Sequence, residues 1–263
     1  MFSNLAQLIR YRGLVQSLVA RELKARYRGS VLGFVWSFVS PLLLLSIYSF
    51  VFTTIMKNDE PRTKPFAVFT FCGLLPWTWF SASLTEASSS LISGGNLIKK
   101  VLFPAEVLPI VAVLANMVHF LLGLVILVAF MIGFQHFPSA ADLPWFPLVV
   151  LVQLVFTVGL ALALSALTVH FRDIRDLLSN VLTLWFFTTP IIYPYFMDSV
   201  SRFIWLFRLN PFFHLVVSYQ EILFFGGFGH ARSLFLMALL SAGVFLAGYW
   251  LFDRLRDSFA EAV

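Results

Sequence analysis

Aromatic side chains that could contact a sugar ring gather on both sides of residue 190. The cluster, which Pro190 and Pro194 interrupt, consists of Trp185, Phe186, Phe187, Tyr193 and Tyr195. Aromatic faces pack against the C–H groups of a sugar ring, and Tyr and Trp add polar edges. Phe186 and Tyr193 are seven residues apart, so a continuous helix would place them on one face. These residues predict a glycan contact, with packed or lipid-facing aromatics as the alternative.

Polar residues also recur in the apolar stretch that follows residue 210. His214, Ser218 and Glu221 have i, i+4 and i+7 spacing, which predicts a polar stripe on a helix. Asn210 and Pro211 form a typical helix start, with Asn as the N-cap and Pro at the first position. At membrane depth such a stripe needs water or protein beside it. His214 with Glu221 is also the one thin candidate for an acid/base pair.

The sequence carries no common catalytic or metal-binding signature. It has no phosphate-binding Gly-rich loop, no HExxH, no paired carboxylates and a single cysteine, Cys72. We therefore expect no catalytic residue, metal site or cofactor in this chain. We identify His119 as the only ionisable residue clearly inside a span, with Asn116 one turn earlier, and favour a helix–helix hydrogen bond over a pore role for this pair. Ion-coupled carriers usually place charges mid-membrane, so we do not expect coupling to an ion gradient.

Composition predicts an all-α polytopic membrane protein. Hydrophobic residues make up 60% of the chain and charged residues 12%, against about 25% charged in soluble domains. Six apolar runs are long enough to cross a bilayer. We place these predicted spans at 31–56, 66–89, 105–134, 145–170, 177–196 and 233–252.

Two regions outside the spans have their own patterns. Residues 1–30 alternate apolar and basic positions, which predicts an amphipathic helix on an anionic membrane surface, in which Gly13 could cause a break. The six-helix transmembrane domain would then occupy 31–263. Within residues 197–232, the apolar runs Phe203–Phe207 and Pro211–Phe225 are too short to span. They predict short re-entrant or interfacial helices between spans five and six.

The distribution of basic residues predicts that both termini are cytoplasmic. With the N-terminus inside, twelve basic residues lie on the inner side and six on the outer side. The inner set is Arg10, Arg12, Arg21, Lys24, Arg26, Arg28, Lys99, Lys100, Arg172, Arg175, Arg254 and Arg256, and the outer set is Lys57, Arg62, Lys64, Arg202, Arg208 and Arg232. Because these charges cluster at the ends of apolar runs, the net charge of +5 reflects membrane orientation rather than nucleic-acid binding.

Two predicted inner loops could contact a partner. The loop at about 90–104 reads as a short helix, which could rest on lipid or dock on a protein. Its apolar face holds Leu97, Ile98, Val101 and Leu102, while Lys99 and Lys100 project elsewhere. The link from Arg172 through Asp173 and Arg175 to Asp176 is either a capped, salt-bridged turn or a partner contact.

Several motifs together resemble one known family. The segment 21–33 reads RELKARYRGSVLG and is followed by Trp36 and Pro41. It is similar to the N-terminal signature of type-2 ABC exporter permeases, most of all the branch that exports O-antigen, capsule or teichoic-acid polysaccharides. The residues of the interface-helix motif are Arg26, Tyr27, Arg28, Gly29 and Gly33. The segments 171–176, 185–194 and 209–212 agree with the same family.

The resemblance implies a permease of the cytoplasmic (inner) membrane that works as a homodimer. A separate ATPase subunit would bind ATP and Mg, and the helix at 96–103, together with Arg172, Asp173 and Arg175, would contact that subunit. The short helices with Asn210, Pro211, His214 and Glu221 would lie near the exit. The implied substrate is a lipid-linked polysaccharide, with O-antigen favoured.

Two other functions stay open at this point. A type-2 permease for a drug or another lipid would share the fold without needing a path for sugars. An integral membrane enzyme that acts on lipid-linked sugars would instead need an exposed acid/base pair.

Overall fold

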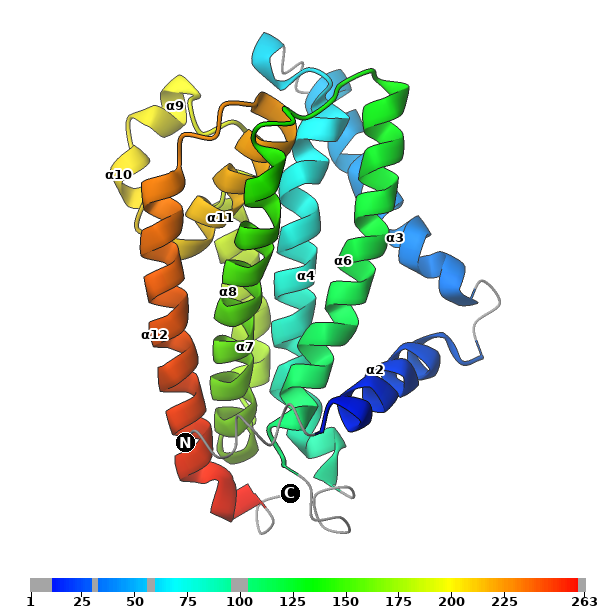
Figure 1. Cartoon of the computed structure of the whole chain (residues 1–263), viewed down its shortest axis with the longest axis vertical. Coiled ribbons are helices and arrows are strands. Elements are labelled where there is room, and N and C mark those ends of the chain that lie inside the picture. Colours follow the sequence, from blue (N-terminus) through cyan, green and yellow to red (C-terminus); the bar gives the residue numbers. More distant parts are fainter. Residues whose placement is uncertain (1–10, 30–32, 56–59, 96–103, 260–263) are drawn as a thin grey trace.

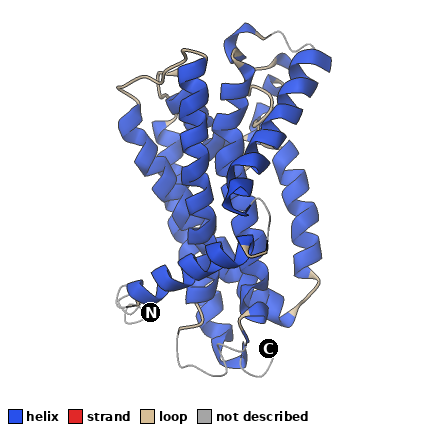
Figure 2. Cartoon of the chain, turned by 90° about the vertical axis from the view of Figure 1, so that its right-hand side faces the viewer, coloured by secondary structure: helices blue, strands red, loops and turns tan. Residues whose placement is uncertain are grey.

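The computed structural model describes residues 11–29, 33–55, 60–95 and 104–259. Throughout these ranges the regular structure is helical, and no strand occurs in them (Figure 2). The longest helices lie side by side in one bundle (Figure 1). They are α3 (Trp36–Ser49), continued by the π-helical segment η2 (Phe50–Ile55), α4 (Phe66–Ser93), α6 (Val107–Gly133), α7 (Phe146–His170) and α12 (Ala231–Leu255).

Within the described ranges, five helical segments are long and apolar enough to cross a membrane. They are Phe38–Ile55, Phe66–Ser93, Val107–Gly133, Leu143–His170 and Ala231–Ser258. Each corresponds to a predicted span, and α6 begins at Val107. The segment around α4 is the most enclosed, with 78% of its apolar window buried. This burial identifies α4 as the centre of the bundle, between α6 and α7 (Figure 1).

The fifth predicted span, at 177–196, is not one long helix. The helix in this region, α8 (Ile174–Phe187), has 14 residues. It is therefore about 21 Å long, whereas a bilayer core is about 30 Å thick. Pro190 follows shortly after its end, and the residue before a proline is pushed out of the helical region. The count of six spans stays a prediction.

The region between α8 and α12 folds into short helices, as the two short apolar runs predict. These are α9 (Asp198–Ser201), α10 (Ile204–Phe207), α11 (Pro211–Gln220) and the π-helical segment η5 (Glu221–Phe225). α9 and α10 lie at one end of the bundle, which we call the α9 end (Figure 1). α11 is enclosed by α4, α7 and α12, and every residue from Leu215 to Gln220 is fully buried.

The opposite end of the bundle, called the α2 end, carries the N-terminal helix α2 (Arg12–Tyr27). α2 lies across the bundle rather than along it (Figure 2). Its Leu18 packs on Val107 and Val111 of α6. α2 begins at Arg12, and residues 1–10 lie outside the described residues, so the predicted break at Gly13 stays a prediction. The predicted amphipathic helix thus uses part of its apolar face on the protein.

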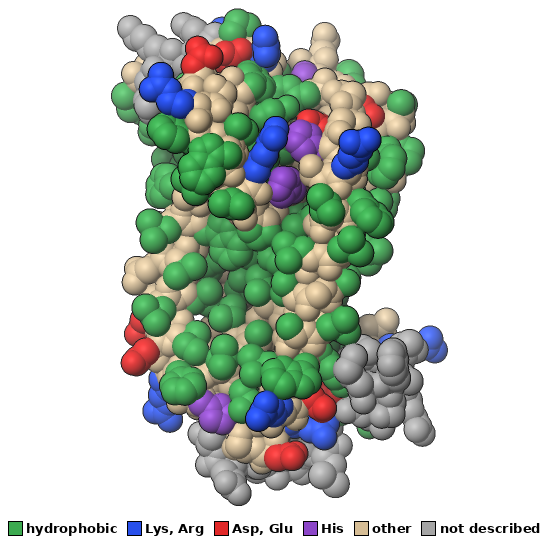
Figure 3. All heavy atoms as spheres, turned by 90° about the vertical axis from the view of Figure 1, so that its left-hand side faces the viewer, with side chains coloured by type: hydrophobic (Ala, Val, Ile, Leu, Met, Phe, Trp, Pro, Cys, Tyr) green, Lys and Arg blue, Asp and Glu red, His purple; other side chains and the backbone are tan. Residues whose placement is uncertain are grey.

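The surface of the bundle changes from charged to apolar and back to charged along its long axis. In Figure 3 hydrophobic side chains dominate the middle of the molecule, and most charged side chains lie near the two ends. Short 3-10 turns connect or extend the longer helices. They are η1 (Gly33–Val35), η3 (Pro61–Thr63), η4 (Leu143–Trp145) and η6 (Arg256–Ser258).

Candidate transport site

A groove of about 430 Å³ runs between α3, α4 and α8. It combines hydroxyl groups, aromatic rings and aliphatic side chains. Its lining consists of Leu44, Tyr48, Leu74, Trp77, Thr78, Ser81, Thr85, Ser179, Leu182, Thr183, Phe186 and Phe187. We call it the α4–α8 groove.

Hydroxyl groups line the α4–α8 groove on two facing helices. Thr78, Ser81 and Thr85 follow one face of α4, and Ser179 and Thr183 are one turn apart on α8. Each donates its proton to a backbone carbonyl three or four residues earlier, at 2.9–3.4 Å. A hydroxyl oxygen that donates in this way keeps lone pairs that can accept a hydrogen bond. The groove therefore presents two rows of acceptors for the O–H groups of a polar substrate.

Three aromatic rings form one wall of the α4–α8 groove. The Phe186 ring stacks on Tyr48 at a centroid distance of 5.8 Å and meets Trp77 at 5.7 Å. Phe186 is 8% exposed, whereas its neighbour Phe187 is 59% exposed. Phe186 thus belongs to the packed wall of the groove, and Phe187 belongs to its open edge.

The other three predicted glycan-path residues lie outside the groove lining. Trp185 donates its indole N–H to Asn210 Oδ1 at 2.6 Å. The Tyr193 hydroxyl donates to the Phe187 carbonyl at 2.6 Å, and Tyr195 donates to Glu221 at 3.4 Å. The predicted shared helical face of residues 186 and 193 is wrong, because α8 ends at residue 187.

Asn210 connects the end of α8 to the start of α11. Its Oδ1 accepts from the Phe212 backbone N–H at 2.9 Å, which confirms the predicted N-cap ahead of Pro211. Its Nδ2 donates to the Thr188 carbonyl at 3.1 Å and to Thr189 Oγ1 at 2.9 Å. Together with the bond from the Trp185 indole, one side chain holds two separate segments in place.

His214 and Glu221 do not form an acid/base pair. The imidazole Nε2 of His214 bonds to the Arg208 carbonyl at 3.0 Å. Glu221 instead accepts from the Gly229 backbone N–H at 3.0 Å and pairs with His230 Nδ1 at 2.6 Å. The stripe on α11 therefore faces protein, and Glu221 connects the start of η5 to the loop that precedes α12.

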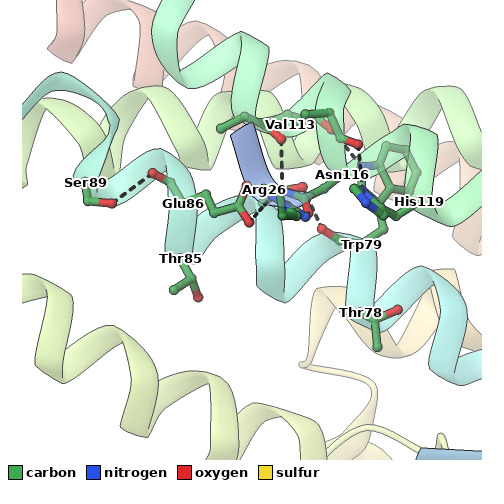
Figure 4. Close-up of polar contacts among 12 residues, drawn as sticks. Arg26, Thr78, Trp79, Thr85, Glu86, Ser89, Val113, Asn116 and His119 are labelled. Atoms are coloured by element: carbon green, nitrogen blue, oxygen red, sulfur yellow. Dashed lines mark hydrogen bonds and ion pairs between the residues drawn. The ribbon is translucent and has the colours of Figure 1, made fainter. Parts of the chain in front are cut away.

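A polar cluster joins the interface helix to the bundle at the α2 end (Figure 4). Arg26 of α2 forms an ion pair with Glu86 of α4 and donates to Asn116 Oδ1 of α6 at 3.2 Å. Asn116 donates in turn to Glu86 at 2.7 Å. Our identification of His119 as the only ionisable residue clearly inside a span is wrong, since Glu86 lies within α4.

Sequence reasoning missed Glu86, although a carboxylate inside an apolar span is itself a signal. The expected interhelical bond of Asn116 is confirmed, with Arg26 and Glu86 as its partners.

The other residues of the interface-helix motif follow Arg26 in the chain. Arg28 is exposed, and Gly29 and Gly33 adopt positive φ angles of 81° and 48°, which glycine tolerates best. Of Tyr27 only the backbone lies within the described residues.

The two predicted partner-contact loops differ in what the structure describes. The residues from Leu97 to Leu102 lie outside the described residues. Arg172 and Asp173 lie exposed in the link between α7 and α8, and Arg175 lies exposed in the first turn of α8. Within the described ranges their side chains form no ion pair, and Asp173 does not cap α8 through its carboxylate. The salt-bridged turn is therefore not formed there.

Comparison with known proteins decides the family. The family model described as ABC-2 type transporter matches residues 13–224, which is most of the chain. The chain belongs to the ABC-2 type transporter family. The match spans α3 through α11 and so includes the α4–α8 groove and the short helices of the α9 end.

Relatives within this ABC-2 transporter group cover nearly the whole chain. The O-antigen export system permease protein RfbA of Myxococcus xanthus is 41% identical over 98% of each chain. A protein of the same name from Klebsiella pneumoniae is 32% identical over 94% of each chain. The polysialic acid transport protein KpsM of Escherichia coli is 22% identical, over 92% of this chain and 93% of its own length.

Membership of the ABC-2 family identifies this chain as a permease subunit rather than an enzyme. It also implies a partner ATPase. Together with the five apolar helices, it makes the chain a multi-pass protein of the inner membrane. The membrane-enzyme alternative is therefore excluded.

Proposed function

We propose that this chain is the permease of an ABC exporter that moves a lipid-linked polysaccharide, with O-antigen favoured, from the cytoplasm to the outer face of the cytoplasmic membrane. The observation that carries the proposal is the α4–α8 groove, in which facing rows of hydroxyl groups lie beside stacked aromatic rings. The names of the relatives that cover the whole chain support the same substrate class.

The chemistry of the groove suits a moving glycan. Sugar O–H groups can donate to the hydroxyl oxygens of Ser179, Thr183 and the α4 row, while C–H faces pack on aromatic rings. An aromatic pair adds only about 0.5–1.5 kcal/mol beyond area burial, so a polymer can leave each position readily. A drug or lipid permease would gain nothing from these hydroxyl rows, which makes that alternative less favoured.

A polysaccharide path also needs walls on every side. The groove opens at the surface of the single chain, where Phe187 and the neighbouring Leu184 are exposed. A second copy of the chain that faced α3 and α8 would enclose the groove, in agreement with the predicted homodimer. The partner ATPase would bind ATP and Mg.

The proposed energy coupling passes through the loop at 90–104. Val101→Asp would place a carboxylate on the apolar face predicted to dock on the ATPase, at a cost of a few kcal/mol. We expect hydrolysis without export in this variant, with normal membrane insertion. Normal export together with normal ATPase assembly would refute the docking role.

Orientation can be tested by labelling from outside the cell. After replacement of Cys72, single cysteines at Ser201 and Gly229 are expected to react with an impermeant thiol reagent, and one at Asp173 is expected to stay protected. These positions lie at the α9 end and the α2 end, respectively. Labelling of Asp173→Cys in intact cells would reverse the proposed topology.

The glycan path is tested with side chains that line the groove but contribute little to packing. Phe187→Ala combined with Thr183→Val removes one exposed ring and one hydroxyl, and we expect a severe loss of surface polysaccharide per inserted molecule. Asn180→Ala is the matched control, because Asn180 is exposed on the same helix and does not line the groove. Equal export by both variants would remove the α4–α8 groove from the path.

A further inference from the structure

A second cavity lies at the α2 end, next to the α4–α8 groove. It has a volume of about 510 Å³ and lies where the ends of α4 and α7 meet the start of α8. Ligand sites in proteins are commonly about 300–1,000 Å³. Its polar lining consists of Ser89, Ser93, Thr168, Arg172, Arg175 and Asp176. We call it the arginine cavity.

The arginines of this cavity are not neutralised by the protein around them. In the described part of the chain, neither Arg172 nor Arg175 forms a salt bridge. Asp176 is the acidic residue in the lining, so two guanidinium groups face one carboxylate and the cavity is net positive. Guanidinium groups bind phosphate oxygens through paired N–H donors, and hydroxyls such as Ser93 can add further bonds.

The arginine cavity continues the α4–α8 groove along the same two helices. On α4, Thr85 lines the groove and Ser89 lines the cavity, one turn apart. On α8, Ser179 and Arg175 are related in the same way. A substrate in the groove would therefore meet the two arginines at its end.

A third kind of surface lies on α8 beside these two. Leu177, Val181 and Leu184 have i, i+4 and i+7 spacing and are 61%, 49% and 69% exposed. α8 therefore presents an apolar outer face, a hydroxyl-lined groove and a basic first turn. A lipid-linked glycan also has three parts, which are an apolar chain, a polar polymer and the junction between them.

We infer that the arginine cavity binds a phosphate group at the junction between lipid and glycan, with Arg172 and Arg175 as its main ligands. This inference rests on the proposed function, because it assigns the apolar face of α8 to the lipid and the α4–α8 groove to the glycan. It replaces the predicted contact of these arginines with the ATPase.

The test measures binding by the full chain in detergent, by calorimetry at low ionic strength. The probes are farnesyl diphosphate, farnesol as its uncharged counterpart and inorganic diphosphate. Arg172→Gln with Arg175→Gln is expected to weaken farnesyl diphosphate binding at least tenfold and to leave farnesol binding unchanged. The control, Arg202→Gln with Arg208→Gln, removes two exposed arginines near the α9 end and is expected to stay within twofold of the unmodified chain.

Binding of inorganic diphosphate shows whether the phosphate alone is recognised or whether a lipid chain is also required. If the double variant also loses inorganic diphosphate, the phosphate alone is recognised. If the unmodified chain binds only farnesyl diphosphate, a lipid is required. Both results support the site. The corresponding double Lys variant keeps the charge but loses paired donors, so intermediate affinity is expected, and it also reports whether the altered chain folds.

Unchanged binding of farnesyl diphosphate by the Gln double variant would overturn the inference. Equal weakening of farnesyl diphosphate and farnesol would overturn it as well, because the effect would then not depend on phosphate. If that variant binds the diphosphate normally but no longer copurifies with the ATPase, Arg172 and Arg175 belong to the ATPase interface. Failure of the proposed function would be seen separately, as unchanged surface polysaccharide after deletion of the chain.

Discussion

The helices α7 and α12 approach each other very closely at Gly159 and Gly248. A β-carbon on Gly248 would lie 2.0 Å from the Gly159 carbonyl oxygen and 2.9 Å from its carbonyl carbon. A β-carbon on Gly159 would lie 2.6 Å from Phe245 Cα. Both contacts are with backbone atoms, which cannot rotate away. Close helix packing through small residues is a common source of stability inside membranes.

The cost of Gly248→Ala follows from this geometry. Carbon–oxygen contacts between packed helices are normally about 3.3–3.6 Å, so the 2.0 Å contact would have to lengthen by at least about 1.3 Å. Overpacking of this kind costs about 1–3 kcal/mol. Because α7 and α12 share the most extensive helix contact in the bundle, we expect a value of about 2–3 kcal/mol for Gly248→Ala.

Gly243 supplies a matched control on the same helix. A β-carbon at this position meets no atom within 4 Å, and alanine is a better helix former than glycine. Gly243→Ala is therefore expected to be neutral or slightly stabilising. The free energy of unfolding of each variant can be measured by titrating the purified chain from mild detergent into SDS and following helix content and tryptophan fluorescence.

The double variant Gly159→Ala with Gly248→Ala tests whether both added methyl groups meet the same close backbone contact. Once the helices have separated for Gly248→Ala, the second methyl group of Gly159→Ala meets less resistance, so the two costs are expected to be less than additive. If Gly248→Ala unfolds at the same SDS fraction as Gly243→Ala, the close backbone contact does not limit stability. In that case the α7–α12 interface is looser than the structure indicates.

Three further predictions concern the polar contacts. Asn210→Ala removes a helix cap and leaves the partly buried indole N–H of Trp185 unpaired, so we expect a loss of about 2–4 kcal/mol in the same SDS titration. Asn180→Ala, on the exposed surface of α8, is expected to be near neutral. Arg26→Gln leaves Glu86 without its cation at a partly buried position. The double variant Arg26→Gln with Glu86→Gln is expected to lose about 0.5–1.5 kcal/mol less unfolding free energy than the two single variants lose in sum. Strict additivity of the two losses would refute the ion pair. Asp142 accepts from the backbone N–H groups of Gly227 and Phe228 at 2.7 and 3.2 Å. Asp142→Ala is therefore expected to speed amide hydrogen exchange in that loop about tenfold. Unchanged exchange would show that the Asp142 carboxylate does not stabilise the loop.

The long spans could be predicted because hydropathy responds to composition over about 20 residues. Four of them, now α4, α6, α7 and α12, lie within a few residues of their predicted bounds. Span five could not be predicted in the same way, since a hydropathy window does not detect where an apolar run stops being helical. Pro190 was visible, but whether a proline bends, ends or leaves a membrane helix depends on which neighbours satisfy the freed backbone groups.

The candidate site was predictable only in part, for a related reason. Aromatic clustering selected Phe186 and Phe187, which line the α4–α8 groove, together with three residues that do not line it. The hydroxyl row of α4 was not predicted, since this helix carries many Ser and Thr residues and only packing against α8 selects Thr78 and its neighbours. Glu86 was missed because its partner Arg26 lies 60 residues earlier in the chain, in a helix expected to lie on the membrane surface.

The short α8 and the buried α11 depend on each other. α8 ends at residue 187, and the non-helical segment after it exposes backbone carbonyls, which hydrocarbon cannot satisfy. The start of α11 supplies Asn210, whose Nδ2 donates to the Thr188 carbonyl at 3.1 Å. The end of α11 supplies Gln220, whose Nε2 donates to the Pro190 carbonyl at 2.9 Å. The non-helical segment within the bundle is therefore stabilised by a second segment that turns back into the protein beside it, and this explains why residues 215–220 of α11 are fully buried.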